Sequence, residues 1–456
     1  MSRISLRYGA ESDWQERLRF TVELMRETSS RHEPGEVVAG YAERLRSLTN
    51  FEAFVALSRR GLKKPGVLIT RHSEWKHQPD PWSERDKLPV IEGGVLSDLI
   101  YANEAKIIDD FAVPESDPAH PHVGRFRSAI AVPIFDDGQG LNMNLVLSSR
   151  PRAFDPEFFP ELVWTTNLFG RGTKMMVLQK QLKEAYERID HEMQTVGRLQ
   201  RSLLPGEMPR ISSLDLAAHY EPSTRAGGDY YDVFDFGGGR WGILLADVCG
   251  HGPPAAVLMA ITHSLAHMFC KQHVASIVRG DETAPCPAAA LEYLNENLEA
   301  RYTRSNGSFV TAFFAVFDEH TRTLSFASAG HNPPRVKRCS DGSTFVLDSR
   351  VGGMSCQTGG DASLLGLPLG IEPGVAYVSY STRLAVGDQI VFYTDGITEA
   401  RNPAGELFGT DRLDHAIEDC RIDAEGMIRA IIASVDQFAD GRAQEDDRTI
   451  LVAKVR

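Results

Sequence analysis

The chain has 456 residues, of which 42% are hydrophobic and 24% are charged, values that are ordinary for a soluble globular protein. This length predicts two or three domains, and the formal net charge of −13 argues against nucleic acid or an anionic membrane as the main partner. No apolar run approaches the roughly 20 residues that a membrane-spanning helix needs, and the first residues lack the apolar core of a signal peptide. The six cysteines show no Cys-x-x-Cys pairing, so we expect free thiols in a reducing cytoplasm.

The first 172 residues mix helices with short strands. Apolar spacing predicts helices at 17–27, 35–48, 93–102 and 156–168. Strands are predicted at 51–58 and 66–70, a loop at 75–89, and a hairpin at 128–135 and 141–149. This order predicts an α/β domain over residues 1–172.

Residues 173–204 contain no proline, and apolar side chains follow a heptad spacing. The heptad positions are Leu182, Ala185, Ile189, Val196, Leu199 and Leu203. We expect a linker helix over 173–204 that pairs two subunits as a short coiled coil, and hence a homodimer. A single amphipathic helix lying on a domain is the alternative.

The remainder, residues 205–456, begins with strands and ends with helices. Strands are predicted at 214–220, 230–236, 241–248, 309–317, 323–329 and 448–455, and helices at 253–273, 287–302, 410–420 and 424–438. Residues 340–361 are polar and glycine-rich, so we expect a mobile loop there. Antiparallel strands with helices in pairs predict an α+β sandwich instead of a doubly wound sheet.

One stretch, residues 241–256, carries an acid at a strand end. The apolar run to Val248 ends beside Asp247, and two glycines and two prolines then predict a turn and a new helix. Asp247 can be a ligand for a hard metal ion or a helix cap. A third reading is a dinucleotide fingerprint at 250–255, which is disfavoured because the acid expected about 20 residues later is missing.

Three further strand ends carry acids, namely Asp229, Asp395 and the pair Asp446–Asp447. Carboxylates that converge on one point repel one another, so a positive charge must lie among them. Two divalent cations, Mg²⁺ or Mn²⁺, are the economical answer. His263 and His267, four residues apart on a predicted helix, are also capable of metal binding, although packing of the helix is the favoured interpretation.

Five motifs together resemble the PPM-type (type 2C) metal-dependent Ser/Thr protein phosphatases, in their stage II sporulation and sigma-regulatory bacterial branch. They are GGDYYD (227–232), LADVCGHGPPAA (245–256), SAGHNPP (328–334), FYTDGITEA (392–400) and EDDRTILVA (445–453). The resemblance covers roughly residues 200–456 and implies an αββα sandwich of two antiparallel sheets between pairs of helices.

The resemblance also implies residue roles. Asp247 would bridge both ions with the Val248 carbonyl as a further ligand, Asp395 and Asp446 would bind directly, and Asp229 would bind through water. Asp247 and Asp229 are therefore the predicted catalytic residues. Asp447 and Asp232 are assigned no ligand role, and His331 and Asn332 are expected to shape a loop. Cys249 stands where many eukaryotic relatives have a histidine suspected of acting as general acid.

Residues 128–162 resemble a GAF domain, with a PAS-like sensor as the near alternative. This resemblance implies sensing of a small molecule or a protein partner. The combined prediction is a sensor-regulated phosphatase of a phosphorylated STAS-like anti-anti-sigma protein in a partner-switching pathway. The alternative is a catalytically silent, phosphatase-like docking protein.

Overall fold

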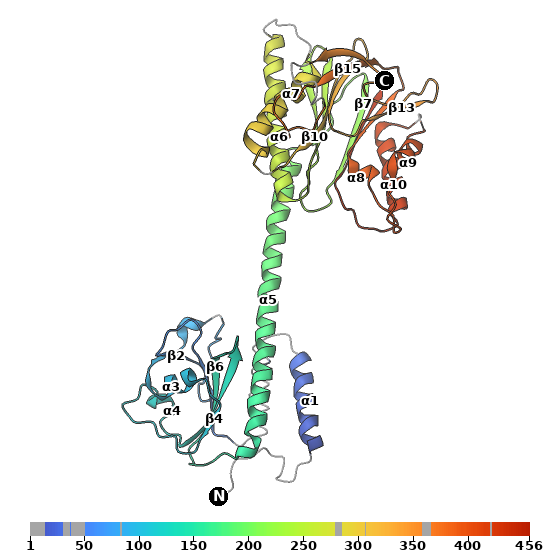
Figure 1. Cartoon of the computed structure of the whole chain (residues 1–456). Coiled ribbons are helices and arrows are strands. Elements are labelled where there is room, and N and C mark those ends of the chain that lie inside the picture. The colour runs from blue at the N-terminus through green and yellow to red at the C-terminus, as the bar shows by residue number, and fades with distance from the viewer. Residues whose placement is uncertain are drawn as a thin grey trace. The chain divides into compact units, whose positions relative to one another are not determined.

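The computed structural model describes residues 14–30, 37, 51–82, 84–278, 285–305, 307–357, 366–419 and 422–456. The chain divides into two compact units, Met1–Glu187 and Arg188–Arg456 (Figure 1). The predicted helix at 35–48 lies outside the described residues apart from Val37, and so does the end of the predicted helix at 410–420.

The N-terminal unit contains a six-stranded antiparallel sheet in the order β3-β2-β1-β6-β5-β4. The strands are β1 Ala53–Ser58, β2 Gly66–His72, β3 Val90–Glu92, β4 Lys106–Ile108, β5 Ser128–Asp136 and β6 Gln139–Ser148. The predicted hairpin is confirmed, since β5 pairs with β6 from Ser128↔Ser148 to Asp136↔Gln139.

Apolar side chains cover both faces of this sheet. On one face, Val55, Ile69 and Leu145 form a core with Leu96 and Ile100 of the helix α3, Gly94–Ala102. On the other face, strand residues pack with the start of the long helix α5, Phe159–Arg201. The other helices of this unit are α1 Trp14–Ser30, the 3₁₀ turn η1 Arg85–Lys87, α4 His120–Val123 and the 3₁₀ turn η2 Pro156–Phe158.

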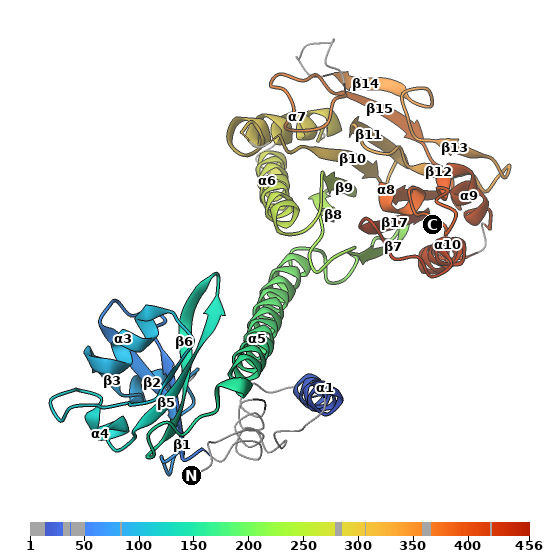
Figure 2. The same cartoon turned by 60° about the horizontal axis from the view of Figure 1, so that its bottom comes forward.

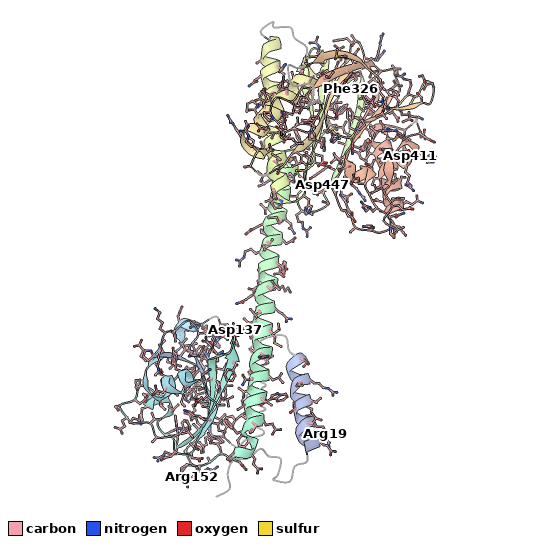
Figure 3. All side chains as sticks on the ribbon, viewed as in Figure 1. Arg19, Asp137, Arg152, Phe326, Asp411 and Asp447 are labelled. Carbon is pink, nitrogen blue, oxygen red and sulfur yellow. The ribbon has the colours of Figure 1, made fainter. Side chains whose placement is uncertain are left out.

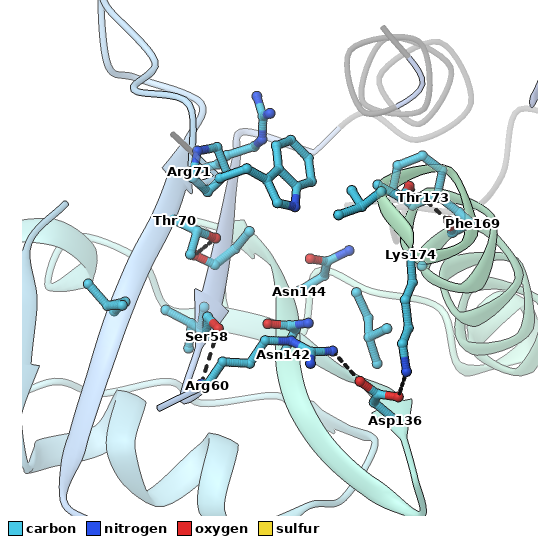
Figure 4. Close-up of a pocket in the computed structure, with 18 of the residues that line it drawn as sticks. Ser58, Arg60, Thr70, Arg71, Asp136, Asn142, Asn144, Phe169, Thr173 and Lys174 are labelled. Carbon is cyan, nitrogen blue, oxygen red and sulfur yellow. Dashed lines mark hydrogen bonds and ion pairs between the residues drawn. The ribbon is translucent and has the colours of Figure 1, made fainter. Parts of the chain in front are cut away.

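A cavity of about 1180 Å³ lies in the N-terminal unit (Figure 4). Strands β1, β2 and β6 and helix α5 contribute lining residues to it. Asp136 accepts a hydrogen bond from Arg60 at 2.6 Å and pairs with Lys174 of α5. Asn142 and Asn144 add amide groups to the lining, so the cavity offers both charged and polar contacts.

The C-terminal unit is built on two antiparallel sheets, in the orders β14-β15-β11-β10-β9-β8 and β13-β12-β16-β17-β7. The strands are β7 Leu214–Glu221, β8 Tyr230–Gly237, β9 Arg240–Val248, β10 Val310–Asp318, β11 Thr323–Ala329, β12 Arg335–Lys337, β13 Thr344–Val346, β14 Gly353–Gln357, β15 Val378–Arg383, β16 Gln389–Tyr393 and β17 Arg448–Val455. The sheets meet through aromatic side chains, because Phe313 of β10 stacks on Phe326 at 5.6 Å and meets Phe392 of β16 edge-on at 5.9 Å.

Helices cover the outer face of each sheet (Figure 2). They are α6 Pro253–Val278, α7 Pro287–Leu298 with the π-helical turn η3 Glu299–Thr303, α8 Asp395–Thr398, α9 Gly409–Ala416 and α10 Ala424–Ala439. The residues Met427, Ile431 and Val435 recur every four positions on α10, and this buried stripe packs on the second sheet. The layers confirm the predicted α+β class and αββα sandwich.

Two expectations were wrong. The segment 340–361, expected as a mobile loop, contains β13 and β14, because these short strands pair with β12 and β15 at sheet edges and need no periodic sequence signal of their own. Cys339 is disulfide-bonded, whereas Cys249, Cys270, Cys286 and Cys356 are free as expected. None of the helices among the described residues combines the length and the hydropathy of a transmembrane segment.

Candidate metal centre

The strand ends of both sheets bring the predicted acids to one place. Tyr230 pairs with Ala246, so the antiparallel register carried one residue further sets Asp229 opposite Asp247. In the second sheet Tyr393 pairs with Ile450, so Asp395, which follows β16, and Asp446, which precedes β17, lie at the same end of these two neighbouring strands. Each sheet therefore supplies two carboxylates, and we call these four residues the acid cluster.

Asp229 joins the two sheets. Its side chain is 1% exposed, and its Oδ2 accepts hydrogen bonds from Thr394 Oγ1 at 2.7 Å and from Thr449 Oγ1 at 2.5 Å. The Thr449 amide in turn donates to Thr394 Oγ1 at 3.0 Å. Thr449 lies in β17 and Thr394 directly follows β16, so these contacts from the second sheet hold a buried acid of the first sheet in one orientation.

The two glycines before Asp229 are required by close packing. A Cβ on Gly227 would lie 2.0 Å from Asp447 Oδ2, and a Cβ on Gly228 would lie 2.6 Å from the Val248 carbonyl oxygen. Only glycine lets the chain pass between these two groups. The Gly-Gly-Asp sequence thus brings the Asp229 backbone against Val248.

Asp446 and Asp447 have different surroundings. Asp447, labelled in Figure 3, is 2% exposed, and its carboxylate accepts hydrogen bonds from the Ser223 amide at 2.7 Å, the Ser223 hydroxyl at 3.1 Å and the Gly228 amide at 2.5 Å. Asp446 is exposed, and its Oδ1 accepts only the neighbouring Asp447 amide in the described part of the chain, at 2.8 Å. Asp447 is therefore occupied with holding the loop, and Asp446 retains oxygen lone pairs for a cation.

The acids of the cluster raise one another's pKa values. Burial and the charges of Asp395 and Asp446 raise the pKa of Asp247 to about 8. Burial and Asp446 raise the pKa of Asp395 to about 6, and burial with Asp247 raises that of Asp229 well above its ordinary value. Burial also raises the pKa of Asp446. Carboxylates that disfavour one another's ionised form in this way are stabilised by a bound cation. Mg²⁺ and Mn²⁺ fit such a site because both prefer hard oxygen ligands.

The turn after Asp247 follows its sequence. Gly250 and Gly252 adopt φ of +85° and +77°, and α6 begins directly afterwards at Pro253. Cys249 is held by structure, because its amide donates to the Phe309 carbonyl at 3.0 Å and its sulfur accepts from the Phe309 amide at 3.1 Å.

His331 lies behind the acid cluster. Its Nδ1 lies 2.8 Å from the hydroxyl of Thr311, which pairs with Asp247 across β9 and β10. Burial lowers the pKa of His331 to about 4, so the imidazole is neutral near pH 7. This placement agrees with the expected structural role.

Three residues that contact the site were not predicted from the sequence, namely Thr394, Thr449 and Gln200. Gln200 of α5 is 4% exposed, donates to the Gly227 carbonyl at 2.5 Å and accepts from the Gly227 amide at 2.9 Å. A glutamine near the end of a predicted helix is the only sequence feature that points to Gln200. Its partner Gly227 lies 27 residues further along the chain in a loop, so the sequence does not reveal the contact.

Comparisons with known proteins found a matching family and several relatives. Residues 237–456 match the family described as Stage II sporulation protein E (SpoIIE). The chain is 28% identical over 273 residues to the phosphoserine phosphatase RsbU of Bacillus subtilis, covering 60% of this chain and 72% of RsbU. It is 27% identical over 291 residues to protein IcfG of Synechocystis sp., covering 60% of this chain and 43% of IcfG.

A solved structure, the SiaA-PP2C domain of Pseudomonas aeruginosa, matches with a TM-score of 0.49 and 20% identity, over 60% of this chain and 99% of that domain. The match to IcfG spans less than half of that protein, whereas the family match fills most of the C-terminal unit. Residues 237–456, a little under half of the chain, therefore resemble the family described as Stage II sporulation protein E, and 60% of the chain is similar to a protein named a phosphoserine phosphatase.

Proposed function

We propose that the C-terminal unit is a metal-dependent serine/threonine protein phosphatase. The observation that carries the proposal is the acid cluster, four carboxylates from two sheets whose proximity raises their pKa values. The likeness to RsbU, which is named a phosphoserine phosphatase, supports the same reaction.

The residues present fit two divalent ions, Mn²⁺ or Mg²⁺. Asp247 would bridge them with the Val248 carbonyl, Asp395 and Asp446 would bind directly, and Asp229 would bind through water. When bound, such ions lower the pKa of a coordinated water and offset charge on the phosphoryl oxygens.

The chain's own contribution is to position these ligands. The two threonine hydroxyls hold Asp229 in one rotamer, and the close approach of Gly228 to the Val248 carbonyl keeps that carbonyl beside the loop of Asp229. Because both sheets contribute, the ligands are placed by the rigid core of the sandwich and not by a single loop.

For the substrate we propose the phosphoserine of a STAS-like anti-anti-sigma protein. The family resemblance and the RsbU likeness support this choice. The competing hypothesis is a docking protein without catalytic activity. It does not explain why four carboxylates lie together in the acid cluster.

The test is phosphate release from a phosphorylated STAS-domain protein by the full-length chain with Mn²⁺. We expect Asp395→Asn to lower the rate at least about a hundredfold, because it removes a ligand from the metal site. The matched control is Asp411→Asn on α9, an exposed aspartate outside the acid cluster, which should leave the rate unchanged. No release from any phosphoprotein by the parent chain with Mn²⁺ would favour the docking function.

We further propose that the N-terminal unit is a GAF-like sensor that regulates the phosphatase through α5. The cavity of about 1180 Å³ gives this unit room for a small molecule. Near the end of α5, Gln200 forms two hydrogen bonds with Gly227, which lies two residues before Asp229. Gln200→Ala, or one residue inserted near Gly197, should change the regulation of phosphate release. The control Gln194→Ala removes an exposed glutamine of the same helix.

Pairing of α5 with a second copy is also proposed, within a cytoplasmic protein. Leu182, Ile189 and Leu199, which occupy heptad positions, have side chains that are 57%, 55% and 65% exposed. Light scattering should report a dimer for the parent chain and a shift toward monomer when Leu182 and Ile189 are changed to aspartate. A monomeric parent would contradict the pairing.

A further inference from the structure

A polar cluster between α6 and β8 has no part in the acid cluster. Strand β8 forms the edge of the first sheet, and side chains alternate along it, so Tyr230, Asp232 and Phe234 share one face. That face meets α6, because the Tyr230 ring lies edge-on to His263 at 5.4 Å and the Phe234 ring lies edge-on to His267 at 5.2 Å. Asp232 therefore points to the helix layer, whereas Asp229 bonds to the second sheet.

The two histidines are one helical turn apart and face Asp232 together. Their ring centroids are 4.3 Å apart. His267 Nε2 lies 2.9 Å from Asp232 Oδ2, and His263 Nδ1 lies 3.9 Å from the same oxygen. One nitrogen or oxygen atom from each of the three residues lies within 4.8 Å of the others.

These separations suit a small tetrahedral ion. With zinc–nitrogen and zinc–oxygen bonds near 2.0–2.2 Å, neighbouring ligand atoms are about 3.4 Å apart. The measured separations of 2.9 and 3.9 Å lie on either side of that spacing. Two imidazoles and a carboxylate are also the ligand types that zinc takes at sites with an open fourth position.

Two further groups fix the carboxylate. The Val233 amide donates to Asp232 Oδ1 at 2.7 Å, and the Tyr230 hydroxyl donates to Oδ2 at 2.8 Å and also lies 3.2 Å from His263 Nδ1. Asp232 is 6% exposed, whereas the His267 side chain is 39% exposed, so an ion has a route from solvent.

We propose that Asp232, His263 and His267 form a binding site for one transition-metal ion of the Zn²⁺ class, separate from the oxygen-only acid cluster. An ion held there fastens α6 to the edge strand β8. Since α6 begins at the turn that follows Asp247 and Val248, the ion would stabilise the segment that carries them. The opposing outcome is a purely structural cluster in which His267 and Tyr230 hydrogen-bond Asp232 without an ion.

The test uses the full-length chain, stripped of metal and carrying Asp247→Asn and Asp395→Asn to weaken the acid cluster. The chain is titrated with Co²⁺ and followed by visible absorption. We expect one Co²⁺ per chain with the intense d–d bands of a four-coordinate ion bound to nitrogen, lost when Zn²⁺ displaces it. His263→Gln with His267→Gln should weaken binding more than about a hundredfold, since losing even an outer-shell partner costs 10- to 100-fold.

The matched control is His415→Gln, which removes an exposed histidine of α9. It should keep both the spectrum and the Co²⁺ affinity. His267→Gln alone guards against misfolding, because its side chain is partly exposed, and circular dichroism should confirm its fold. Zn²⁺ should raise the unfolding temperature of the parent and of His415→Gln but not of His267→Gln. The proposal is overturned if the double histidine variant keeps the parent's cobalt bands, or if the parent shows only the weak bands of octahedral oxygen coordination.

Discussion

Without metal, the acid cluster should destabilise the fold as pH rises. The pKa of Asp247 is about 8 in the folded chain, against an ordinary value of 3.8. Between these values the folded state holds a proton that the unfolded state has released, so the free energy of unfolding falls as pH rises from about 4 to about 8. Asp247→Asn removes this titration, so we expect the metal-free variant to be more stable than the parent at pH 8.

The magnitude follows from linkage. At about 1.4 kcal/mol per pH unit, the raised pKa sets a ceiling of about 6 kcal/mol. Asp229 shares the repulsion, and removing one acid relieves only part of it. We therefore expect a gain of about 2–4 kcal/mol at pH 8 and little difference at pH 4. With Mn²⁺ at a thousand times its Kd the order should reverse, because only the parent gains about 4.1 kcal/mol from binding.

The assay is urea unfolding in EDTA at several pH values, read by Trp241 fluorescence. Trp241 is the one tryptophan of the C-terminal unit, so changing the other four to phenylalanine makes the signal report that unit alone. Its indole donates to Glu319 Oε1 at 2.6 Å, a contact that unfolding breaks. The reasoning is refuted if the metal-free variant is less stable than the parent at pH 8, or if the parent's stability rises from pH 5 to pH 8.

Three further predictions concern the packing around the acids. Gly396→Ala should destabilise the chain by several kcal/mol in thermal unfolding, because its Cβ would lie 2.0 Å from the Asp447 carbonyl oxygen, whereas Gly353→Ala meets open space and should change little. The pKa of His331 is about 4 in the folded chain, below its ordinary value of 6.5, so the parent should lose stability as pH falls from about 6.5 to 4. His331→Gln should reduce this loss. Equal slopes of the unfolding free energy against pH in the two proteins would contradict the prediction. Thr394→Val removes a hydrogen bond to a buried carboxylate, so it should cost about 1–3 kcal/mol in urea unfolding, and a cost near zero would show that the hydroxyl does not hold the acid.

The family resemblance and the layer architecture could be predicted from the sequence because they depend on local patterns. An apolar strand that ends in an acid and a glycine, as at Asp395, is visible in a few consecutive residues, and so is the four-residue stripe of α10. The predicted sandwich is confirmed, and the ligand roles of the individual aspartates remain predictions that the metal experiments above test.

The contacts that orient those acids were decided by the tertiary structure alone. Asp229 accepts hydrogen bonds from the hydroxyls of Thr394 and Thr449, which lie 165 and 220 residues further along the chain. Gly227 is hydrogen-bonded to Gln200 of α5. Hydrogen bonds of this kind form only when two sheets, or a helix and a loop, pack together. The periodicity of the sequence therefore does not predict them. The same reason explains the edge strands in 340–361 and the disulfide at Cys339, since both depend on partners that packing brings near.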